Sequence, residues 1–167
     1  MKLKIKTLIR KYTPYILLLL GIWVIVAFFI AGGVNTSEQV MNPNNAEERY
    51  LFTLFQVMFG KSLTVDGTKL TYFKPNFFGF IIIPFMVFGL ILPTINKVNF
   101  KTRHMVSALL LLVSALALFI LPKVAVLGSG WVDPSKVVVT MGPVLIVTGS
   151  ITAVFAVINF ALSIFKE

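Results

Sequence analysis

The 167-residue sequence contains no cysteine and a single histidine, His104. The absence of cysteine excludes disulfides, thiolate nucleophiles and cysteine-ligated metal sites. One histidine with no acidic residue near it in the sequence does not supply the ligands of a metal centre, so we expect no metal and no other cofactor. His104 follows Arg103 at the start of an apolar run, where we predict a solvated residue and not a catalyst.

Acidic residues are scarce as well, with six Asp or Glu against fifteen Lys or Arg. The interiors of the long apolar runs contain no Asp, Glu, Lys, Arg or His. Ionisable groups inside membrane spans are costly, and where they occur they mark ion pathways and proton relays. Their absence argues against ion-coupled transport and against intramembrane carboxylate catalysis.

Catalytic sequence patterns are lacking too. The sequence has no Walker A loop and no GxGxxG, GxSxG or HExxH motif. Glu47 and Glu48 suit the first turn of a helix and Asp66 suits a turn, which leaves Glu38 without a second uncommitted carboxylate for acid–base catalysis. We therefore expect no catalytic residue and no enzymatic activity.

What the sequence has is apolar length. Its hydrophobic content is 57% and its mean hydropathy is +0.93, far above a soluble domain. A signal peptide is an alternative interpretation of the first run, but that run is longer than the roughly fifteen residues that such signals reach at most. We predict an all-α membrane protein, a four-helix transmembrane bundle in a single polytopic domain over residues 1–167, with spans at about 15–34, 76–95, 105–121 and 142–165.

The Lys and Arg residues are unevenly distributed. The N-terminal arm, which ends at Pro14, and the loop after the second span carry eight of them, whereas the other two loops carry six together with five acids. The positive-inside rule therefore places both termini in the cytosol of a cell membrane, and a Phe, Ile, Lys and Asn bias is typical of a bacterial source. No aromatic residues alternate with the charges, so nucleic acid is not expected. The arm is expected to contact anionic lipids of the inner leaflet through Lys2, Lys4, Lys6, Arg10 and Lys11.

Residues 35–75, between the first two spans, are predicted to form a small extracytoplasmic cap. Its first part is a loop rich in Asn, Thr, Ser and Pro. Asn45 is a candidate helix N-cap with Glu48 in the capping-box position, and apolar residues then recur at helical spacing up to Gly60. We predict an amphipathic helix of about fourteen residues that lies in the membrane plane or packs on the segment that follows it.

That following segment contains the strongest hairpin signal in the chain, Asp66-Gly67 between two alternating runs. An isolated hairpin is marginally stable in water, so it is expected to lean on the helix, on the third loop or on lipid. A two-residue turn predicts the cross-strand pairs Val65–Thr68, Leu63–Leu70 and Lys61–Tyr72.

Pro122 is expected to end the third span. The loop that follows contains Trp131, an expected anchor at the membrane interface. Asp133-Pro134 could begin a helix, or the run from Val137 to Val139 could form a strand beside the hairpin. The residues expected to contact a partner or the membrane are Leu51, Phe55, Met58, Phe59, Leu63, Leu70, Tyr72 and Trp131.

Other residues are expected to set helix packing. Ser107 with Ser114, and Ala108 with Ala115, repeat at seven residues and indicate one helix-facing seam. The fourth span contains the small-residue pair Gly149 and Ala153 and one strongly polar amide, Asn159. In the second span, Pro84 is expected to kink the helix, either to fit its shape to the neighbouring helices or to act as the hinge of a gate. These packing residues are Gly149, Ala153, Asn159 and Pro84.

Four spans, cytosolic termini and a longer first outer loop with β character resemble the claudin-type tetraspan arrangement. That family's outer-loop Trp and paired cysteines are absent here, so the resemblance assigns no residue a role. We expect a structural or accessory membrane protein whose cap contacts a protein partner, lipid or another copy. The alternative is a small transporter or pore subunit with a path along the kinked second span and the polar fourth span.

Overall fold

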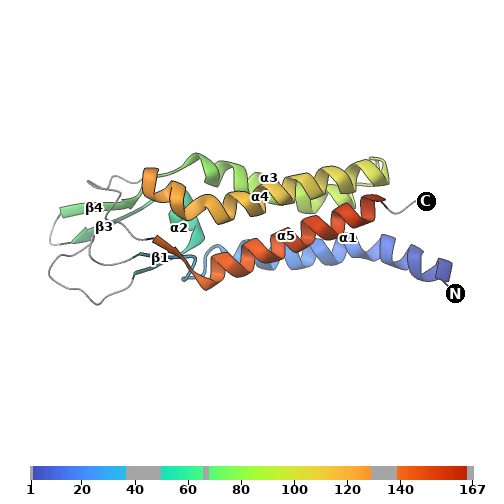
Figure 1. The fold of residues 1–167 in the computed structure, drawn as a ribbon, viewed down its shortest axis with the longest axis horizontal. Coiled ribbons are helices and arrows are strands. Elements are labelled where there is room, and N and C mark those ends of the chain that lie inside the picture. The colour runs from blue at the N-terminus through green and yellow to red at the C-terminus, as the bar shows by residue number, and fades with distance from the viewer. Residues whose placement is uncertain (1, 37–49, 66–67, 129–138, 165–167) are drawn as a thin grey trace.

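The computed structural model describes residues 2–36, 50–65, 68–128 and 139–164, and these are mostly helical (Figure 1). The prediction of four helices that are long and apolar enough to span a membrane is confirmed. The stretches that meet this criterion are Leu8–Ala27, Phe77–Thr94, Phe100–Ala125 and Pro143–Ile164. They belong to α1 (Lys2–Ala27), α3 (Phe77–Ile91) with the short 3₁₀ helix η2 (Leu92–Thr94), α4 (Phe100–Gly128) and α5 (Pro143–Ile164).

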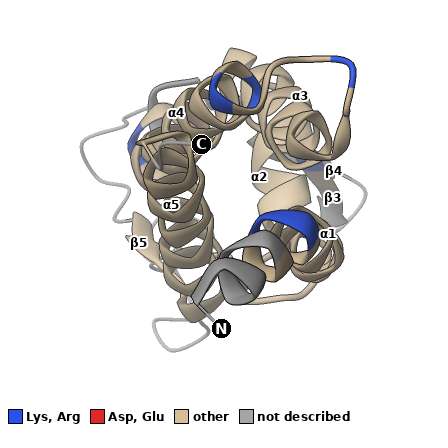
Figure 2. Cartoon of the chain, turned by 90° about the vertical axis from the view of Figure 1, so that its right-hand side faces the viewer, with Lys and Arg blue, Asp and Glu red and all other residues tan. Residues whose placement is uncertain are grey.

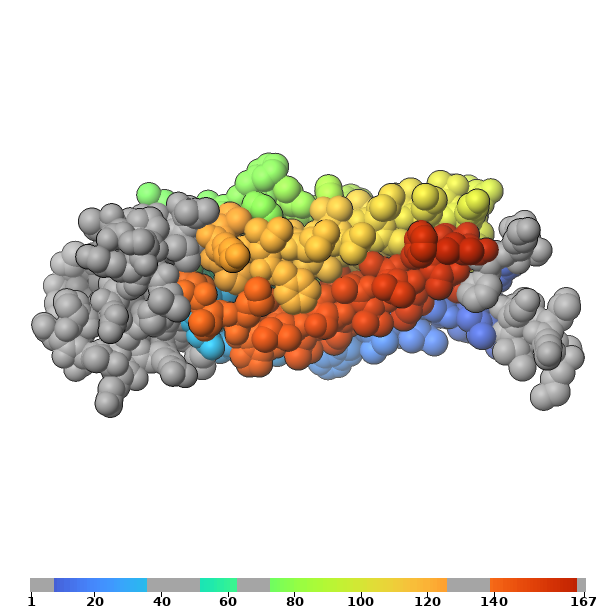
Figure 3. All heavy atoms as spheres, viewed as in Figure 1, coloured from blue at the N-terminus to red at the C-terminus, as the bar shows by residue number. Residues whose placement is uncertain are grey.

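The long helices form a bundle with two different ends. One end carries both chain ends and the connection between α3 and α4, and we call it the terminal end (Figure 1). The other carries the strands, and we call it the strand end. Seen from the terminal end, the helices follow one another around the bundle in the order α1, α3, α4, α5 (Figure 2). The contact between α4 and α5 is the most extensive, and both helices run along one face of the molecule (Figure 3).

A three-stranded antiparallel sheet joins distant parts of the chain at the strand end. Its central strand, β1 (Val34–Thr36), pairs with β2 (Tyr50–Phe52) on one side and with β5 (Val139–Met141) on the other. Of the strand suggested at Val137 to Val139, only Val139 lies among the described residues. It begins β5, which pairs with β1 and not with the hairpin. The sheet thereby ties the exit from α1 to the entry into α5.

The predicted hairpin is present as β3 (Lys61–Val65) and β4 (Thr68–Phe73). Its turn, residues 66–67, lies outside the described residues. Lys61 pairs with Phe73 and not with Tyr72 as predicted, because the register shifts immediately after Lys61. β4 contacts α2 (Leu54–Phe59) and α4, so the hairpin leans on helices. The two predicted pairs next to the turn are confirmed, Val65–Thr68 and Leu63–Leu70.

The helix α2 is much shorter than the amphipathic helix that the sequence predicted. The predicted N-cap region, residues 45–48, lies outside the described residues, and residues 50–52 form β2. The helix begins after Thr53, whose side chain accepts the Gln56 N–H at 3.1 Å while Gln56 Oε1 accepts the Thr53 N–H at 3.1 Å. This is a capping box that stood inside the predicted helix. Gly60 ends the helix with φ 96°, as predicted for a C-terminal glycine.

Two long helices have other limits than predicted. α1 already includes Pro14 and ends at Ala27, so the last residues of the predicted first span leave the helix. Gly32, with φ 98°, adopts a backbone conformation that a helix does not contain. α4 begins earlier than predicted, because Asn99 accepts the Lys101 N–H at 3.0 Å, and it continues past Pro122, which was expected to end it.

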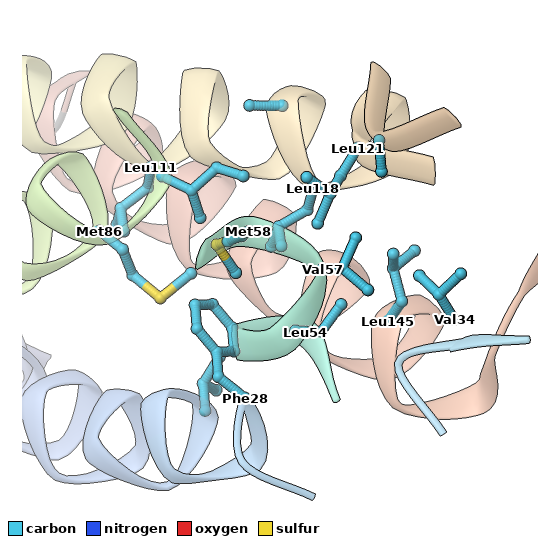
Figure 4. Packing of buried hydrophobic residues seen from close by; sticks show 14 of the residues in the cluster. Phe28, Val34, Leu54, Val57, Met58, Met86, Leu111, Leu118, Leu121 and Leu145 are labelled. Atoms are coloured by element: carbon cyan, nitrogen blue, oxygen red, sulfur yellow. The ribbon is translucent and has the colours of Figure 1, made fainter. Parts of the chain in front are cut away.

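The core is concentrated where α2 enters the bundle. Leu54, Val57 and Met58 are each fully buried. Figure 4 shows these three side chains among residues contributed by α3, α4 and α5 and by the segment after α1. The apolar side of α2 therefore packs inside the strand end of the bundle, which neither predicted alternative included. α2 also contacts β4 of the hairpin, and its position relative to a membrane plane stays a prediction. The labelled surrounding residues are Phe28, Val34, Met86, Leu111, Leu118, Leu121 and Leu145.

Candidate functional site

The residues predicted to contact a partner fall into four groups. Met58 is buried, and a Cβ placed on Gly79 of α3 would lie 2.8 Å from the Met58 Cβ. Phe55 is 38% exposed, and Phe59 is half-buried. Trp131 lies outside the described residues. Four others lie in strands, and the structure does not describe their side chains. These are Leu51, Leu63, Leu70 and Tyr72. Among the predicted residues with a described side chain, only Phe55 and Phe59 reach the surface.

Backbone and amide hydrogen bonds fix α2 between α1 and α3. The Phe55 N–H donates to the Phe28 carbonyl at 3.0 Å, just beyond the end of α1. Asn76 Nδ2 donates to the Val57 carbonyl at 2.9 Å, and the Asn76 N–H donates to the Met58 carbonyl at 3.0 Å. The Asn76 Oδ1 accepts an N–H from the first turn of α3, so the same side chain caps that helix. The sequence showed Asn76 only as the start of a span, because its partners on α2 lie 18 and 19 residues away.

The exposed side of α2 carries a chain of four phenylalanine rings, which we call the aromatic row: Phe29, Phe55, Phe59 and Phe80. Ring centroids of successive members are 4.9, 4.7 and 5.5 Å apart. The two outer rings, from the segment after α1 and from α3, are 61% and 60% exposed. The row thus crosses from the end of α1 to α3 over α2, as a continuous apolar surface.

The predicted seam on α4 faces α3. The Ser107 hydroxyl donates to the Gly89 carbonyl, and the Ser114 hydroxyl donates to the Ile82 carbonyl at 3.3 Å. The alanines that repeat with these serines are buried as well. These bonds satisfy polar groups inside an apolar interface, as hydroxyls commonly do between helices of a membrane bundle.

The packing residues on α5 and α3 take different positions. Gly149 lies against α4, where a Cβ would be 2.8 Å from the Phe119 ring. Ala153 is half-buried, and Asn159 is 1% exposed. Pro84 is exposed on the outside of α3.

The threonines of α5 do not form a polar path. Thr148 and Thr152 are 2% and 1% exposed, and their hydroxyls donate to carbonyls of their own helix at 2.7 Å. Such bonds satisfy the hydroxyls without water. Since Pro84 faces outward and these threonines are closed off, the residues proposed for a transport path do not converge on a common cavity.

A buried polar pair joins α4 and α5 near the terminal end. His104 is fully buried, with Nδ1 2.7 Å from the Asn159 Oδ1. The prediction of a solvated histidine is therefore wrong. The reason is the early start of α4, which gives His104 a helical position facing α5. The Nε2 atom of His104 has no hydrogen-bond partner.

The ring of Phe100 lies beside this pair and makes cation–π contacts with two arginines. Its centroid is 4.4 Å from the His104 ring centroid. The guanidinium carbons of Arg10 and Arg103 lie 5.1 and 5.2 Å from the same ring, one from α1 and one from α4. Arg103 also donates from Nη1 to the Ile95 carbonyl at 2.9 Å. The cluster links α1 to α4 by cation–π contacts, which hydropathy alone does not reveal.

An apolar groove lies between α1 and α5, with a volume of about 490 Å³. It is partly open on the side of the bundle, and its lining is almost entirely carbon. Its walls are formed by Leu20, Trp23, Val24 and Ala27 of α1 and by Val147, Thr148, Ser150, Ile151, Val154 and Phe155 of α5.

The chemistry open to the described part of the chain is limited. All six acidic residues of the sequence lie outside the described ranges, as the absence of red in Figure 2 illustrates. Within those ranges, no group of three or more His, Cys, Asp or Glu residues is placed to hold a metal ion. Comparison with protein-family models, curated proteins and solved structures gives no match for this chain. The arrangement therefore offers surfaces for contact and packing, with no cluster of catalytic groups among the described residues.

Proposed function

We propose that this chain is a multi-pass protein of a bacterial cell membrane and acts as a structural or accessory component. Its strand end would lie outside the cell and contact a protein partner, lipid or another copy. Both termini would be cytosolic. The observation that carries this proposal is the fixed position of α2, which presents the exposed aromatic row at the rim of the bundle.

Charge supports the proposed orientation. Residues 2–11 and 96–104, which lie at the terminal end, hold eight Lys or Arg and no acid. The rest of the sequence holds seven Lys or Arg and six acids. Figure 2 shows Lys and Arg of α1, of α4 and of the loop before α4 at the terminal end. Excess basic charge favours the cytosolic side and contact with anionic lipids, for which the arm residues Lys2 to Lys11 are proposed.

The aromatic row supports the proposed contact. Exposed and contiguous apolar surfaces mark interaction sites, and aromatic residues are enriched where partners pack. α2 is tied to α1 by the Phe55 backbone and to α3 by Asn76, so the row is ordered before any partner arrives. Little ordering entropy would be lost on contact at a surface that is already rigid.

The transport alternative receives less support. It needs a wet path, and the threonines and Asn159 of α5 are buried and hydrogen-bonded. The groove between α1 and α5 is lined by carbon and opens sideways, which does not suit an ion or a polar solute.

Site-specific photocrosslinking in native membranes tests the proposed contact. A photoreactive amino acid at Phe55 or Phe80 should trap a discrete neighbour, which is a protein partner, a second copy or a lipid, whereas one at Phe88, which is 64% exposed elsewhere on α3, should not. Equal crosslinking at all three positions, or none at any of them, would refute the contact.

Orientation is tested separately by labelling. Because the chain has no cysteine, each single-cysteine variant carries one reactive site. An impermeant maleimide on intact cells should label Lys74→Cys at the strand end and should label Lys97→Cys only after lysis. The reverse pattern would overturn the orientation, and labelling of both variants only after lysis would overturn membrane insertion.

A further inference from the structure

The groove between α1 and α5 is a consequence of how α1 packs. At Gly21, α1 approaches α3 so closely that a Cβ would lie 2.4 Å from the Leu90 Cδ1. Trp23 is 73% exposed and lies at the groove, so its ring is not withdrawn into the core. The helix is therefore packed tightly on its α3 side, and space remains on its α5 side.

The walls of this groove offer almost no free hydrogen-bonding groups to a water molecule. The Thr148 hydroxyl is already bonded to the Val144 and Leu145 carbonyls, at 2.7 and 3.1 Å. The rest of the lining surface is almost entirely apolar, and its two other polar side chains, the Trp23 indole and the Ser150 hydroxyl, belong to exposed residues. A water molecule is stable in a cavity only where it finds two to four polar partners, and apolar cavities prefer apolar occupants.

The size of the groove discriminates between apolar occupants. It extends from Leu20 to Ala27, which is about 12 Å of helix axis at 1.5 Å per residue. A helix from a second copy would need a seam along most of a roughly 30 Å span, more than twice that length. A single thin, flexible chain needs no such seam and matches a short groove of about 490 Å³.

We propose that the groove is a binding site for one acyl chain of a membrane lipid. The proposal rests on the membrane location proposed above, because only there does a lateral opening face lipid tails. The site holds the chain between α1 and α5 in the half of the bundle nearer the strand end. The bound chain fills the space left between α1 and α5 and stabilises the position of α1 against α5.

Tryptophan fluorescence reports on this site directly. The chain has two tryptophans, Trp23 and Trp131, so Trp131→Phe leaves Trp23 at the groove as the sole reporter. The delipidated full-length protein in detergent is titrated with phosphatidylcholine that carries bromine atoms on its acyl chains. Saturable quenching of Trp23 fluorescence is expected.

Filling the groove should weaken that quenching. Ala27→Phe places a ring in the groove, and the lipid concentration for half-maximal quenching should rise roughly tenfold, as expected when the burial of about two methylene groups is lost. Val26→Phe is the matched control, because Val26 is 46% exposed and does not line the groove. A second pair, Ser150→Leu against Val157→Leu, repeats the comparison from α5 in case Ala27→Phe disturbs folding.

Two outcomes of these titrations would overturn the proposed acyl-chain site. Equal quenching in groove and control variants would show that detergent-borne lipid quenches an exposed ring without a site, and would overturn the proposal. Dimerisation that protects Trp23 from the quencher would assign the groove to a second copy and would also overturn it. Failure of the partner crosslinks at Phe55 and Phe80 leaves this titration intact, whereas failure of membrane insertion appears in the Lys74 and Lys97 labelling. The two proposals therefore fail separately.

Discussion

The Oδ1 atom of Asn159 lies 2.7 Å from the Nδ1 atom of His104, and this buried contact joins α5 to α4. Asn159 Nδ2 donates to the Phe155 carbonyl at 3.0 Å, which fixes the orientation of the amide. Its oxygen therefore faces the histidine, and Nδ1 must carry the proton that this oxygen accepts. The pair determines the tautomer of the single histidine in the chain.

Asn159→Leu should destabilise the bundle by about 1 kcal/mol or somewhat more, because His104 would keep a buried Nδ1–H without an acceptor. The double variant His104→Leu with Asn159→Leu should recover much of that loss, since both polar partners are then replaced by apolar groups. Unfolding of the solubilised protein by a denaturing detergent measures both. A double variant that is destabilised by the sum of the single effects would show that the two residues do not act as a pair.

Two glycines should respond differently to the same substitution. A Cβ at Gly142 would lie 1.9 Å from the Gly32 carbonyl oxygen, where the backbone is held by β1 and β5. A Cβ at Gly149 would lie 2.8 Å from the Phe119 ring, which can rotate or shift. Overpacking of a core costs about 1–3 kcal/mol, and we expect Gly142→Ala at or above the top of that range and Gly149→Ala near the bottom. Thermal unfolding of the two variants ranks them, and the opposite order would contradict the close backbone crossing.

The helix α2 should depend on its capping box. Thr53→Ala removes the oxygen that accepts the Gln56 N–H and should cost about 1 kcal/mol, whereas Thr53→Ser keeps that oxygen and should cost much less. Hydrogen–deuterium exchange of residues 54–59 is the measurement, and it should accelerate in Thr53→Ala alone. Equal exchange in both variants would show that tertiary contacts, and not the cap, hold this helix.

The four long helices could be predicted because about twenty consecutive apolar residues are a local property of the sequence. Their ends could not be read from the same property. Asn99 accepts an N–H at the start of α4, and turns at Phe28 to Ile30 replace the helical pattern after Ala27; hydropathy registers neither. Pro122 was expected to end a helix, yet Pro in long apolar helices is tolerated where neighbouring groups satisfy the freed carbonyl.

The strand end shows why pairing and burial between distant segments could not be predicted from the sequence. The hairpin was predictable because its two runs and its turn residues are adjacent in sequence. The segment at Tyr50 was assigned to a helix, because its pairing with Thr36 across the intervening segment leaves no local trace. The burial of His104 depends in the same way on Asn159, 55 residues away. Local periodicity identified elements, whereas contacts between distant segments decided which residues are buried.

Asn76 connects α2 to α3 with two functions that can be separated. Its Oδ1 accepts the Gly79 N–H at 3.2 Å and caps α3, while its Nδ2 donates to the Val57 carbonyl at 2.9 Å and holds α2. Asn76→Asp keeps an oxygen for the cap, and Asp is as good an N-cap as Asn. It places a second oxygen where the donor was, so the Val57 carbonyl loses its partner and faces an acceptor.

We therefore expect Asn76→Asp to leave α3 formed and to release α2, at a cost of about 1–3 kcal/mol for the unsatisfied buried group. Exchange of the amides of residues 54–60 should accelerate, while exchange in the first turn of α3 should stay as slow as in the parent. Asn76→Ala, which lacks both atoms, should accelerate both regions and serves as the comparison. Because the aromatic row rests on α2, Asn76→Asp should also abolish crosslinking from Phe55 while retaining the four long helices. A variant in which α2 exchanges as slowly as in the parent would show that its buried side chains hold it without this bond.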